Sequence, residues 1–294
     1  MGEQSLILIT GAAGFVGCHV SQAAQKAGLK IRTLARTQAA GIDWCADLSD
    51  QRVVATLPLS TVTTIIHCAA AVPSRSGAFE RDNVQAAASL AACLVAAESL
   101  RRIVHISSIA VYRRPVAAPW MISEDASVVD ILSEEAEPYA RSKRLVEISL
   151  DRVAELRRDV FVSHLRASSI YGPRMVSTTL LPTIVRCARQ NAPIILRGPR
   201  AYRQNFVHVE DVASLALMFA TNHHARSGPL NAFSDDTYGL FDLANMVRTR
   251  LNSKSAIVDE TENRDIIAPH FDNSRARCLH RFRRLEFHLR DTVP

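Results

Sequence analysis

Residues 6–20 of this 294-residue chain read LILITGAAGFVGCHV. The apolar run at residues 6–9 has the length of a buried strand, and the residues after the glycines are compatible with a helix. Gly11, Gly14 and Gly17 separate these two elements at G-x-x-G-x-x-G spacing. A strand, a glycine turn and a helix start in this order predict a cradle for nucleotide phosphates, with helix N–H groups directed at them.

Each glycine has its own role in such a cradle. Gly11 permits a sharp turn, Gly14 lets the backbone approach a pyrophosphate, and Gly17 lets the helix pack close to the strand. Phe15 and Val16 stand at the first helical positions, so their backbone N–H groups join the predicted contacts. The spacing is one residue wider at its start than the usual dinucleotide fingerprint.

Composition and charge narrow the class of protein. The chain is 48% hydrophobic and 22% charged, which is typical of a soluble globular protein. No apolar run approaches the ~18 residues that span a membrane, and no basic stretch precedes the first apolar run, so neither a membrane segment nor a signal peptide is expected. Six scattered cysteines favour a reducing cytoplasm. The net charge of +6 comes largely from arginines near the C-terminus, a pattern more typical of a solvated face or an anionic small substrate than of nucleic-acid binding.

Strands and helices alternate in the first part of the chain. We expect strands at residues 31–34, 64–67, 103–106 and 160–165, with helices at 15–27, 78–97 and 139–158. This order predicts an α/β fold, a Rossmann-type doubly wound parallel sheet with helices on both faces.

After Gly172 the pattern changes to short helices and strands, which indicates a smaller, mixed α/β lobe for the substrate. We expect the nucleotide-binding domain at 1–171, with 205–225 returning to it, and the substrate-binding lobe at 172–204 and 226–294. No metal site is predicted, because the pair His223 and His224 has no third ligand spaced nearby and is interpreted as a solvated loop.

The end of the second strand bears on the choice of cofactor. In dinucleotide folds an acidic residue there bonds both ribose hydroxyls of NAD, but this strand is followed by a cation, Arg36. Arg36 therefore favours the 2′-phosphate of NADP, and the alternatives are NAD or a loop arginine that faces solvent.

Further cofactor contacts are expected at other strand ends. Asp47 and Leu48 lie in a turn where a side chain could meet the adenine. Ala69 and Ala70 are small residues at the end of the strand at 64–67, where they leave room for a ligand. Asn83 near the start of the next helix is included in this set.

Three side chains suggest a reaction. Tyr139 and Lys143 lie four residues apart on a predicted helix, so their side chains share one face. A lysine ammonium beside a phenol lowers the pKa of the phenol and makes it a usable proton donor and acceptor. Ser108, at the end of the strand at 103–106, could hold a substrate oxygen. Such a set predicts hydride chemistry, in which a cofactor supplies the hydride and the protein supplies the proton.

The chain resembles an extended short-chain dehydrogenase/reductase of the NAD-dependent epimerase/dehydratase type. The similar segments cover nearly the whole chain: Thr10-Gly-Ala-Ala-Gly-Phe-Val-Gly17, His67-Cys-Ala-Ala70, Asn83-Val84, Ser107-Ser-Ile-Ala-Val-Tyr112, Glu124-Asp125, Pro138-Tyr-Ala-Arg-Ser-Lys143, Arg166, Tyr171-Gly-Pro-Arg174 and the run from Arg203 to Ala213.

The resemblance implies roles for particular residues. It selects Ser108 over Ser107 as the motif serine and gives Tyr139 and Lys143 the acid/base and ribose-binding roles. It also implies a nucleotide-sugar substrate, whose diphosphate is held by the smaller lobe. Substrate contacts are then expected at Ser108, Arg174 and Arg203, and a homodimer is expected to form through the helices that contain Ala91 and Tyr139.

Two departures from the family narrow the reaction. Similar sugar 4,6-dehydratases carry an Asp-Glu pair directly after the serine or threonine, and related 3,5-epimerase/reductases carry a cysteine two positions after it. This chain has Ile109 and Ala110 there. We therefore expect a reductase or dehydrogenase that interconverts a keto group and an alcohol, at C4 of a nucleoside-diphosphate sugar. The alternatives are a 4-epimerase with retained NAD, a reductase of a non-sugar ketone, and a non-catalytic nucleotide sensor.

Overall fold

The computed structural model describes residues 5–73, 78–175, 178–222 and 227–289. The chain forms two compact units. The first unit contains Met1–Arg113, Ser127–Arg166 and Val212–Leu230, and the second contains Arg114–Ala126, Ala167–Asp211 and Asn231–Pro294. None of the helices in the described ranges is long and apolar enough to cross a membrane. His223 and His224 lie outside the described residues.

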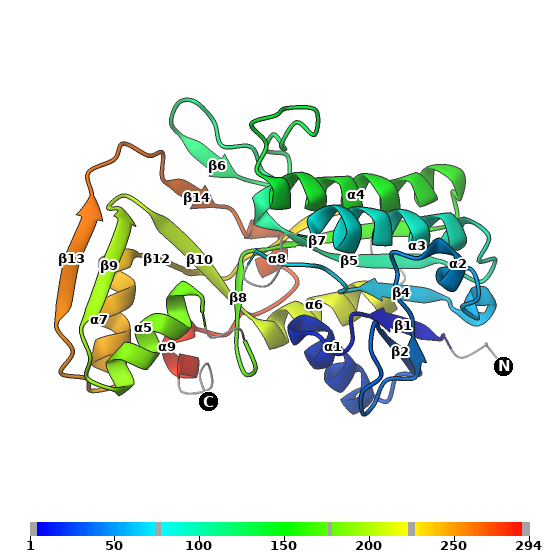
Figure 1. The fold of residues 1–294 in the computed structure, drawn as a ribbon, viewed down its shortest axis with the longest axis horizontal. Helices are drawn as coiled ribbons and strands as arrows, with labels where there is room; N and C mark the ends of the chain where they lie inside the picture. The colour runs from blue at the N-terminus through cyan, green and yellow to red at the C-terminus, as the bar shows by residue number, and fades with distance from the viewer. Residues whose placement is uncertain (1–4, 74–77, 176–177, 223–226, 290–294) are drawn as a thin grey trace. The chain divides into compact units, whose positions relative to one another are not determined.

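A seven-stranded sheet organises the first unit (Figure 1). In spatial order its strands are β11 (Gly228–Ala232), β7 (Phe161–Ala167), β5 (Arg102–Ser108), β4 (Thr64–His67), β1 (Ile7–Thr10), β2 (Ile31–Ala35) and β3 (Trp44–Cys45). The four pairings from β5 through β4, β1 and β2 to β3 are parallel. Every residue of β1 and β4 is buried, which is why both strands are largely apolar instead of alternating. The predicted α/β fold is confirmed.

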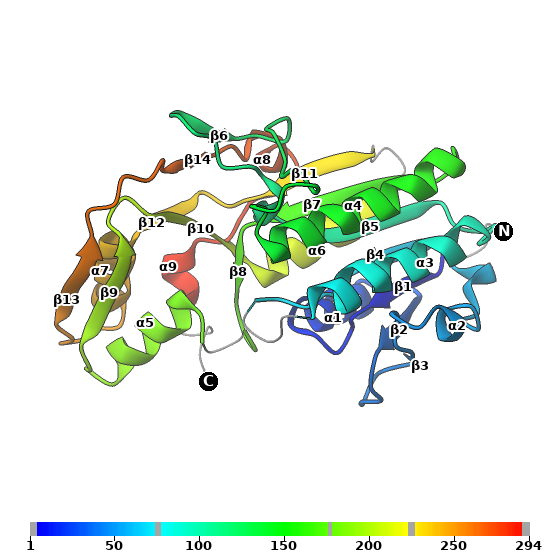
Figure 2. The same ribbon diagram turned by 45° about the horizontal axis from the view of Figure 1, so that its top comes forward.

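Helices cover both faces of this sheet. Figures 1 and 2 show α3 (Ala86–Val95) and α4 (Pro138–Leu156) on one face, and α1 (Phe15–Lys26) and α6 (Val209–Thr221) on the other. The core under α3 and α4 is apolar and includes Leu90, Leu94, Val146, Leu150 and Ile65. The short helix α2 (Gln51–Val54) packs beside α3, and a π-helical stretch, Glu80–Gln85, leads into α3.

The second unit is built from small sheets and helices. Its sheets are β12 (Asp236–Gly239), β10 (Arg203–His208) and β8 (Ser169–Tyr171); β13 (Ile257–Glu262) with β9 (Ile194–Pro199); and β14 (Pro269–Phe271) with β6 (Trp120–Ile122). Its helices are α5 (Leu180–Arg189), α7 (Leu240–Arg250), α8 (Ser274–Arg277) and α9 (Leu285–His288). Tyr171, Phe206 and Leu243 belong to its core.

The division between the units differs from the predicted domains. Residues 114–126 were expected in the first domain, but they belong to the second unit because β6 pairs in parallel with β14. A three-residue strand inside a proline-containing loop carries no periodic signal, and its partner lies far away in the sequence. The first unit also ends its second segment at Arg166, and its returning segment is Val212–Leu230.

Candidate active site

The glycine loop after β1 is held close to the end of β4. Gly11 has a φ of 66°, in the left-handed region that favours glycine. A Cβ atom on Gly11 would lie 2.6 Å from the backbone of Ala69, and one on Gly17 would lie 2.2 Å from the carbonyl oxygen of Gly11. Both positions therefore exclude any side chain, and Gly17 brings α1 against the loop as predicted.

The start of α1 fits the pyrophosphate of a dinucleotide. Gly14 is the N-cap residue, no side chain caps the helix, and its first turn contains no acidic residue. The N–H groups of Phe15, Val16 and Gly17 are therefore available to an anion without competition from a capping side-chain oxygen. The loop also lies where the strand order reverses, since β1 stands between β4 and β2. Ligands of open α/β sheets bind at such a reversal.

Arg36 is held between two carboxylates. Its Nη2 donates to Asp82 Oδ1 at 2.7 Å, and its Nε lies 3.7 Å from Asp47 Oδ2. Arg81 also binds Asp82. Burial acts to raise the pKa of Asp82, but the bonds from Arg81 and Arg36 outweigh it and the pKa is lowered, so this carboxylate stays charged. A 2′-phosphate at Arg36 would therefore also meet two negative charges.

Other expected cofactor residues take different positions. Leu48 is 5% exposed and belongs to the hydrophobic core, and its contact with the adenine stays a prediction. Asp47 Oδ1 accepts bonds from the N–H and hydroxyl of Ser49. Ala69 is half-buried against the glycine loop, and Ala70 is exposed.

Asn83 acts as a brace. Its Oδ1 accepts from the N–H of Ala71 at 2.6 Å, and its Nδ2 donates to the carbonyl of Ala71 and to the hydroxyl of Ser142. The side chain is 2% exposed and its amide is occupied by three protein partners. Asn83 therefore links the loop after β4 to the residue before Lys143, and its cofactor contact stays a prediction.

Ser108 and Tyr139 meet at the end of β5. The hydroxyl of Ser108 caps the short turn Ile109–Val111 by accepting from the N–H of Ala110 at 3.1 Å, and it also shares a hydrogen bond with the side chain of Tyr139. Tyr139 is half-buried and stacks beside Phe79 at 5.5 Å between ring centroids. The neighbouring Ser107 points inward and donates to Glu147 at 2.7 Å. The structure thus places Ser108, and not Ser107, beside the tyrosine.

Lys143 lies one turn further along α4 and is 2% exposed. Its Nζ donates to the carbonyl of Ile106 at 2.7 Å and contacts His105 Nε2 at 3.1 Å. Burial lowers the pKa of Lys143 to about 8, against the opposing charge of Glu147. The predicted lowering of the tyrosine pKa is wrong: burial raises the pKa of Tyr139, and the bond to Ser108 offsets this only partly. The lysine ammonium is bonded to the end of β5 instead.

A buried ion pair supports this face of α4. Glu147 has a side chain that is 0% exposed and accepts from Arg166 Nε at 2.9 Å and Nη2 at 2.8 Å. Burial would raise the pKa of Glu147, but the bonds from Arg166 and Ser107 lower it to about 2. Arg166 also stacks over the ring of Tyr112 at 4.8 Å. Arg166 resembles a family position in the sequence, but neither Glu147 nor this pairing was predicted.

The two expected substrate arginines belong to the second unit. Arg203 begins β10 and Arg174 follows β8, and both are exposed. Arg174 has a φ of 71°, an uncommon conformation for a residue with a side chain. β8 and β10 pair in parallel with Phe206 opposite Ser169 and His208 opposite Tyr171, so Arg203 lies at the start of this pair and Arg174 lies beyond its other end.

Several C-terminal arginines are paired inside the second unit. Arg283 binds Asp211 and Glu210, and Arg284 Nε lies 3.1 Å from Asp236 Oδ1. The expected solvated basic face is therefore partly neutralised by acidic residues of the same unit.

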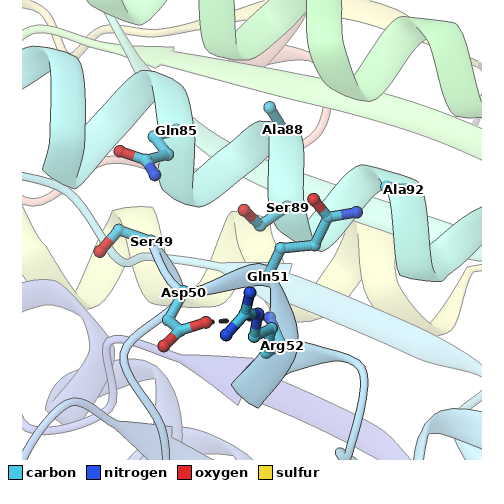
Figure 3. Close-up of a pocket in the computed structure, with 8 residues that line it drawn as sticks. All are labelled: Ser49, Asp50, Gln51, Arg52, Gln85, Ala88, Ser89 and Ala92. Atoms are coloured by element: carbon cyan, nitrogen blue, oxygen red, sulfur yellow. Dashed lines mark hydrogen bonds between the residues drawn. The ribbon is translucent and has the colours of Figure 1, made fainter.

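Two hollows lie apart from these groups. One, of about 610 Å³, lies between α2 and α3 and is shown in Figure 3; its lining is polar or small and consists of Ser49, Asp50, Gln51, Arg52, Gln85, Ala88, Ser89 and Ala92. The other, of about 470 Å³, belongs to the second unit and includes Arg114, Arg264 and Ile266. Neither is lined by Ser108, Tyr139 or Lys143.

The doubly wound sheet, the glycine loop after β1 and the Ser-Tyr-Lys set are the features expected of a dinucleotide-dependent enzyme. The chain belongs to the NAD dependent epimerase/dehydratase family, whose model matches residues 7–232. The predicted family and the predicted enzyme class are confirmed, since this is a family of NAD-dependent enzymes.

Individual relatives are distant. The chain is 26% identical over 238 residues to the trifunctional UDP-glucose 4,6-dehydratase/UDP-4-keto-6-deoxy-D-glucose 3,5-epimerase/UDP-4-keto-L-rhamnose-reductase RHM2 of Arabidopsis thaliana. That match covers 70% of this chain and 34% of the relative. The chain therefore spans about a third of the length of the curated relatives it matches.

Solved structures share the fold. The UDP-glucose 4-epimerase of Thermus thermophilus in complex with NAD superposes with a TM-score of 0.81 at 17% identity, covering 98% of this chain and 97% of that one. MoeE5 in complex with UDP-glucose and NAD gives a TM-score of 0.77 at 23% identity, covering 97% and 96%.

Proposed function

We propose that this protein is an NAD-dependent oxidoreductase that interconverts an alcohol and a ketone on a nucleoside-diphosphate sugar, at C4 of the sugar. The observation that carries the proposal is that Ser108, at the end of β5, and Tyr139, one helical turn before the buried Lys143, come together so that the Ser108 hydroxyl lowers the pKa of the phenol. A hydroxyl beside a phenol can hold a substrate oxygen while the phenol donates or accepts its proton.

The glycine loop, Ser108 and Tyr139 have separate roles in the proposed reaction. The backbone at Gly11, Gly14 and Gly17 would hold the pyrophosphate of the cofactor, which supplies or accepts the hydride when bound. Ser108 positions the substrate oxygen, and Tyr139 exchanges a proton with it. Burial raises the pKa of Tyr139, so the phenol is protonated at neutral pH and is poised as an acid for ketone reduction.

We infer that the cofactor is NAD. The two carboxylates on Arg36 oppose the 2′-phosphate of NADP, which was the preferred prediction from the sequence. Structures of similar fold contain NAD, which agrees with this choice. Titration of the protein with NADH and NADPH checks it, and tighter binding of NADPH would restore the original prediction.

The substrate class follows from the family and from the arginines of the second unit. Arg174 and Arg203 are exposed cations suited to a diphosphate. Ile109 and Ala110, in the turn capped by Ser108, cannot abstract a proton from a second carbon. The dehydratase and 3,5-epimerase activities in the name of the Arabidopsis relative are therefore not proposed for this chain. A homodimer and a cytoplasmic location stay predictions.

The test is Tyr139→Phe assayed with NAD and a panel of UDP-glucose, UDP-glucuronic acid and UDP-N-acetylglucosamine. The variant should lose ~10²- to 10⁴-fold in kcat, because it lacks the proton donor, while its NADH affinity stays within about twofold. Tyr238→Phe in the second unit is the matched control and should retain turnover. Undiminished turnover in Tyr139→Phe would overturn the assignment. Inversion at C4 without net NADH formation would instead identify a 4-epimerase.

A further inference from the structure

A line of buried imidazoles continues from Lys143. His105 Nε2 lies 3.1 Å from Lys143 Nζ, and His105 Nδ1 lies 3.2 Å from His164 Nδ1. His164 Nε2 lies 3.0 Å from Asp151 Oδ1. His105 is 1% exposed and His164 is 2% exposed, whereas the side chain of Asp151 is 45% exposed. The line therefore leads from a buried ammonium to a carboxylate in contact with solvent.

One set of tautomers satisfies every contact. Lys143 can only donate, so His105 accepts at Nε2 and carries its hydrogen on Nδ1. His105 Nδ1 then donates to His164 Nδ1, which leaves the hydrogen of His164 on Nε2. That hydrogen is donated to Asp151, which accepts it as a carboxylate. All three bonds therefore point the same way, from the lysine to the surface.

The surroundings keep the His105 ring in this line neutral. Burial and the nearby Lys143 hold the pKa of His105 well below its usual value, so its ring is uncharged. His67, whose ring centroid lies 5.7 Å from that of His105, has its pKa lowered to about 3 by burial. The charge of Arg166 is paired with Glu147 on the adjoining face. A neutral imidazole with one donor and one acceptor nitrogen can pass a proton by taking one and releasing another.

We propose that His105, His164 and Asp151 form a proton relay that connects Lys143 with solvent during turnover. The inference rests on the proposed function, because the proposed oxidation of an alcohol releases the proton that the relay would carry. The three residues act through Lys143 and touch no substrate, so they are relay residues and not members of the catalytic set.

The proton balance requires such a route for a net oxidation. When an alcohol is oxidised, its C–H leaves as hydride and its O–H leaves as a proton. The Lys143 ammonium first releases a proton to His105 Nε2, His105 Nδ1 releases its proton to His164 Nδ1, and His164 Nε2 releases its proton to Asp151 and water. The neutral amine of Lys143 then accepts the phenol proton of Tyr139, one turn away on α4, and the phenolate takes the proton of the substrate hydroxyl, which restores both groups. Ketone reduction runs every transfer in reverse. A 4-epimerase returns the proton to the same oxygen and needs no net exchange with solvent.

Single-turnover kinetics test the relay directly. Formation of NADH is followed by absorbance, and release of the proton is followed with a pH indicator in weak buffer, using NAD with whichever sugar of the UDP panel is oxidised. In the wild type both signals should rise together. In Asp151→Asn and His164→Gln, whose side chains can hydrogen-bond but cannot carry the proton onward, proton release should lag by at least about tenfold. Proton release that keeps pace with NADH in His164→Gln would overturn the relay.

A control variant and a chemical rescue experiment distinguish a relay from a structural role. Glu155→Gln makes the same carboxylate-to-amide change one turn along α4, at a side chain that is 58% exposed, and should leave proton release unchanged. Added formate should restore fast release in Asp151→Ala, because it can accept the proton that the missing carboxylate no longer takes. Absence of any rescue, together with an equal lag in Glu155→Gln, would contradict the proposal.

A measurement without substrate keeps the relay distinct from the proposed function. Nitrogen NMR of ¹⁵N-histidine-labelled wild-type protein, assigned with His164→Gln, reports which ring nitrogen carries hydrogen. We expect the Nδ1–H tautomer at His105 and the Nε2–H tautomer at His164. Those tautomers in a protein that oxidises no sugar would refute the proposed function and leave the line intact, whereas an Nε2–H tautomer at His105 would refute the relay itself.

Discussion

The phosphate loop and the polar layer behind Lys143 lie in the same unit but are built on opposite principles. At the loop, Gly11 and Gly17 have no side chain because the backbone of Ala69 and of the loop itself occupies the space. The polar layer behind Lys143 consists of side chains that are bonded to one another, namely Ser107 with Glu147, Glu147 with Arg166, Lys143 with His105, and His105 with His164. The loop has backbone N–H groups that are available to a ligand, whereas the charged side chains of the layer are paired within the protein.

The difference predicts which kind of substitution damages each region. A loop that works through close backbone approach fails when atoms are added. A buried polar layer fails when one partner is removed, because the other is left without water or a bond. The four predictions below use these opposite sensitivities.

The largest effect is expected at the loop. Gly17→Val adds a side chain where even a Cβ atom would lie 2.2 Å from the carbonyl oxygen of Gly11. We expect a loss of about 5 kcal/mol in the free energy of unfolding, together with loss of NADH binding. Chemical denaturation and fluorescence titration measure the two. Gly41→Ala, whose Cβ would meet open space, is the control and should cost about 1 kcal/mol for its φ of 78° alone.

Removal of charge from the polar layer ranks second. Glu147→Gln leaves Arg166 without its buried carboxylate, and we expect a loss of about 4 kcal/mol in the free energy of unfolding. Urea denaturation of the variant measures it. Glu155→Gln on the same helix breaks only an exposed pair with Arg152 and should cost less than about 1 kcal/mol. Equal losses in the two variants would show that Glu147 is not a buried pair.

Acid should weaken the layer before it affects the loop. The pKa of Glu147 is about 2 in the folded protein, below its usual 4.5. The ionised Glu147 therefore contributes about 3 kcal/mol to the free energy of unfolding above pH 4.5, and this contribution is lost as the pH falls toward 2. The stability difference between the wild type and Glu147→Gln should shrink by this amount over that range. A difference that does not vary with pH would contradict the assigned pKa.

The smallest effect is expected at the side of the loop, where Arg36 is paired. Asp82→Asn removes one of the two carboxylates on Arg36 and should move the ratio of NADPH to NADH affinity toward NADPH by about tenfold, or about 1.4 kcal/mol. Parallel titrations of the wild type, Asp82→Asn and Glu155→Gln measure the ratio. If Asp82→Asn leaves the ratio unchanged, the pairing of Arg36 does not control cofactor choice.

The sequence predicted those parts of the protein that depend on neighbours along the chain. The strand at residues 64–67 was predicted with its bounds as found, and the helix with Tyr139 and Lys143 on one face begins at Pro138. Periodicity and glycine spacing carry this information because strands and helices repeat over a few residues. The same reasoning missed β6, whose three residues are too few for a period and whose partner strand is β14.

Contacts between distant residues were decided only by the tertiary structure. The sequence predicted a phosphate contact for Arg36 and a cofactor contact for Asn83, but only the fold shows that Arg36 is bonded to Asp82 and that the Asn83 amide is bonded to Ala71 and Ser142. Nothing around His105 or His164 in the sequence indicates a shared bond, since they occupy different strands. The sequence determined the family and predicted the phosphate cradle and the reaction groups, because all of these depend on local patterns. The partners of each buried charge depend on which strands lie side by side, and only the folded chain defines that.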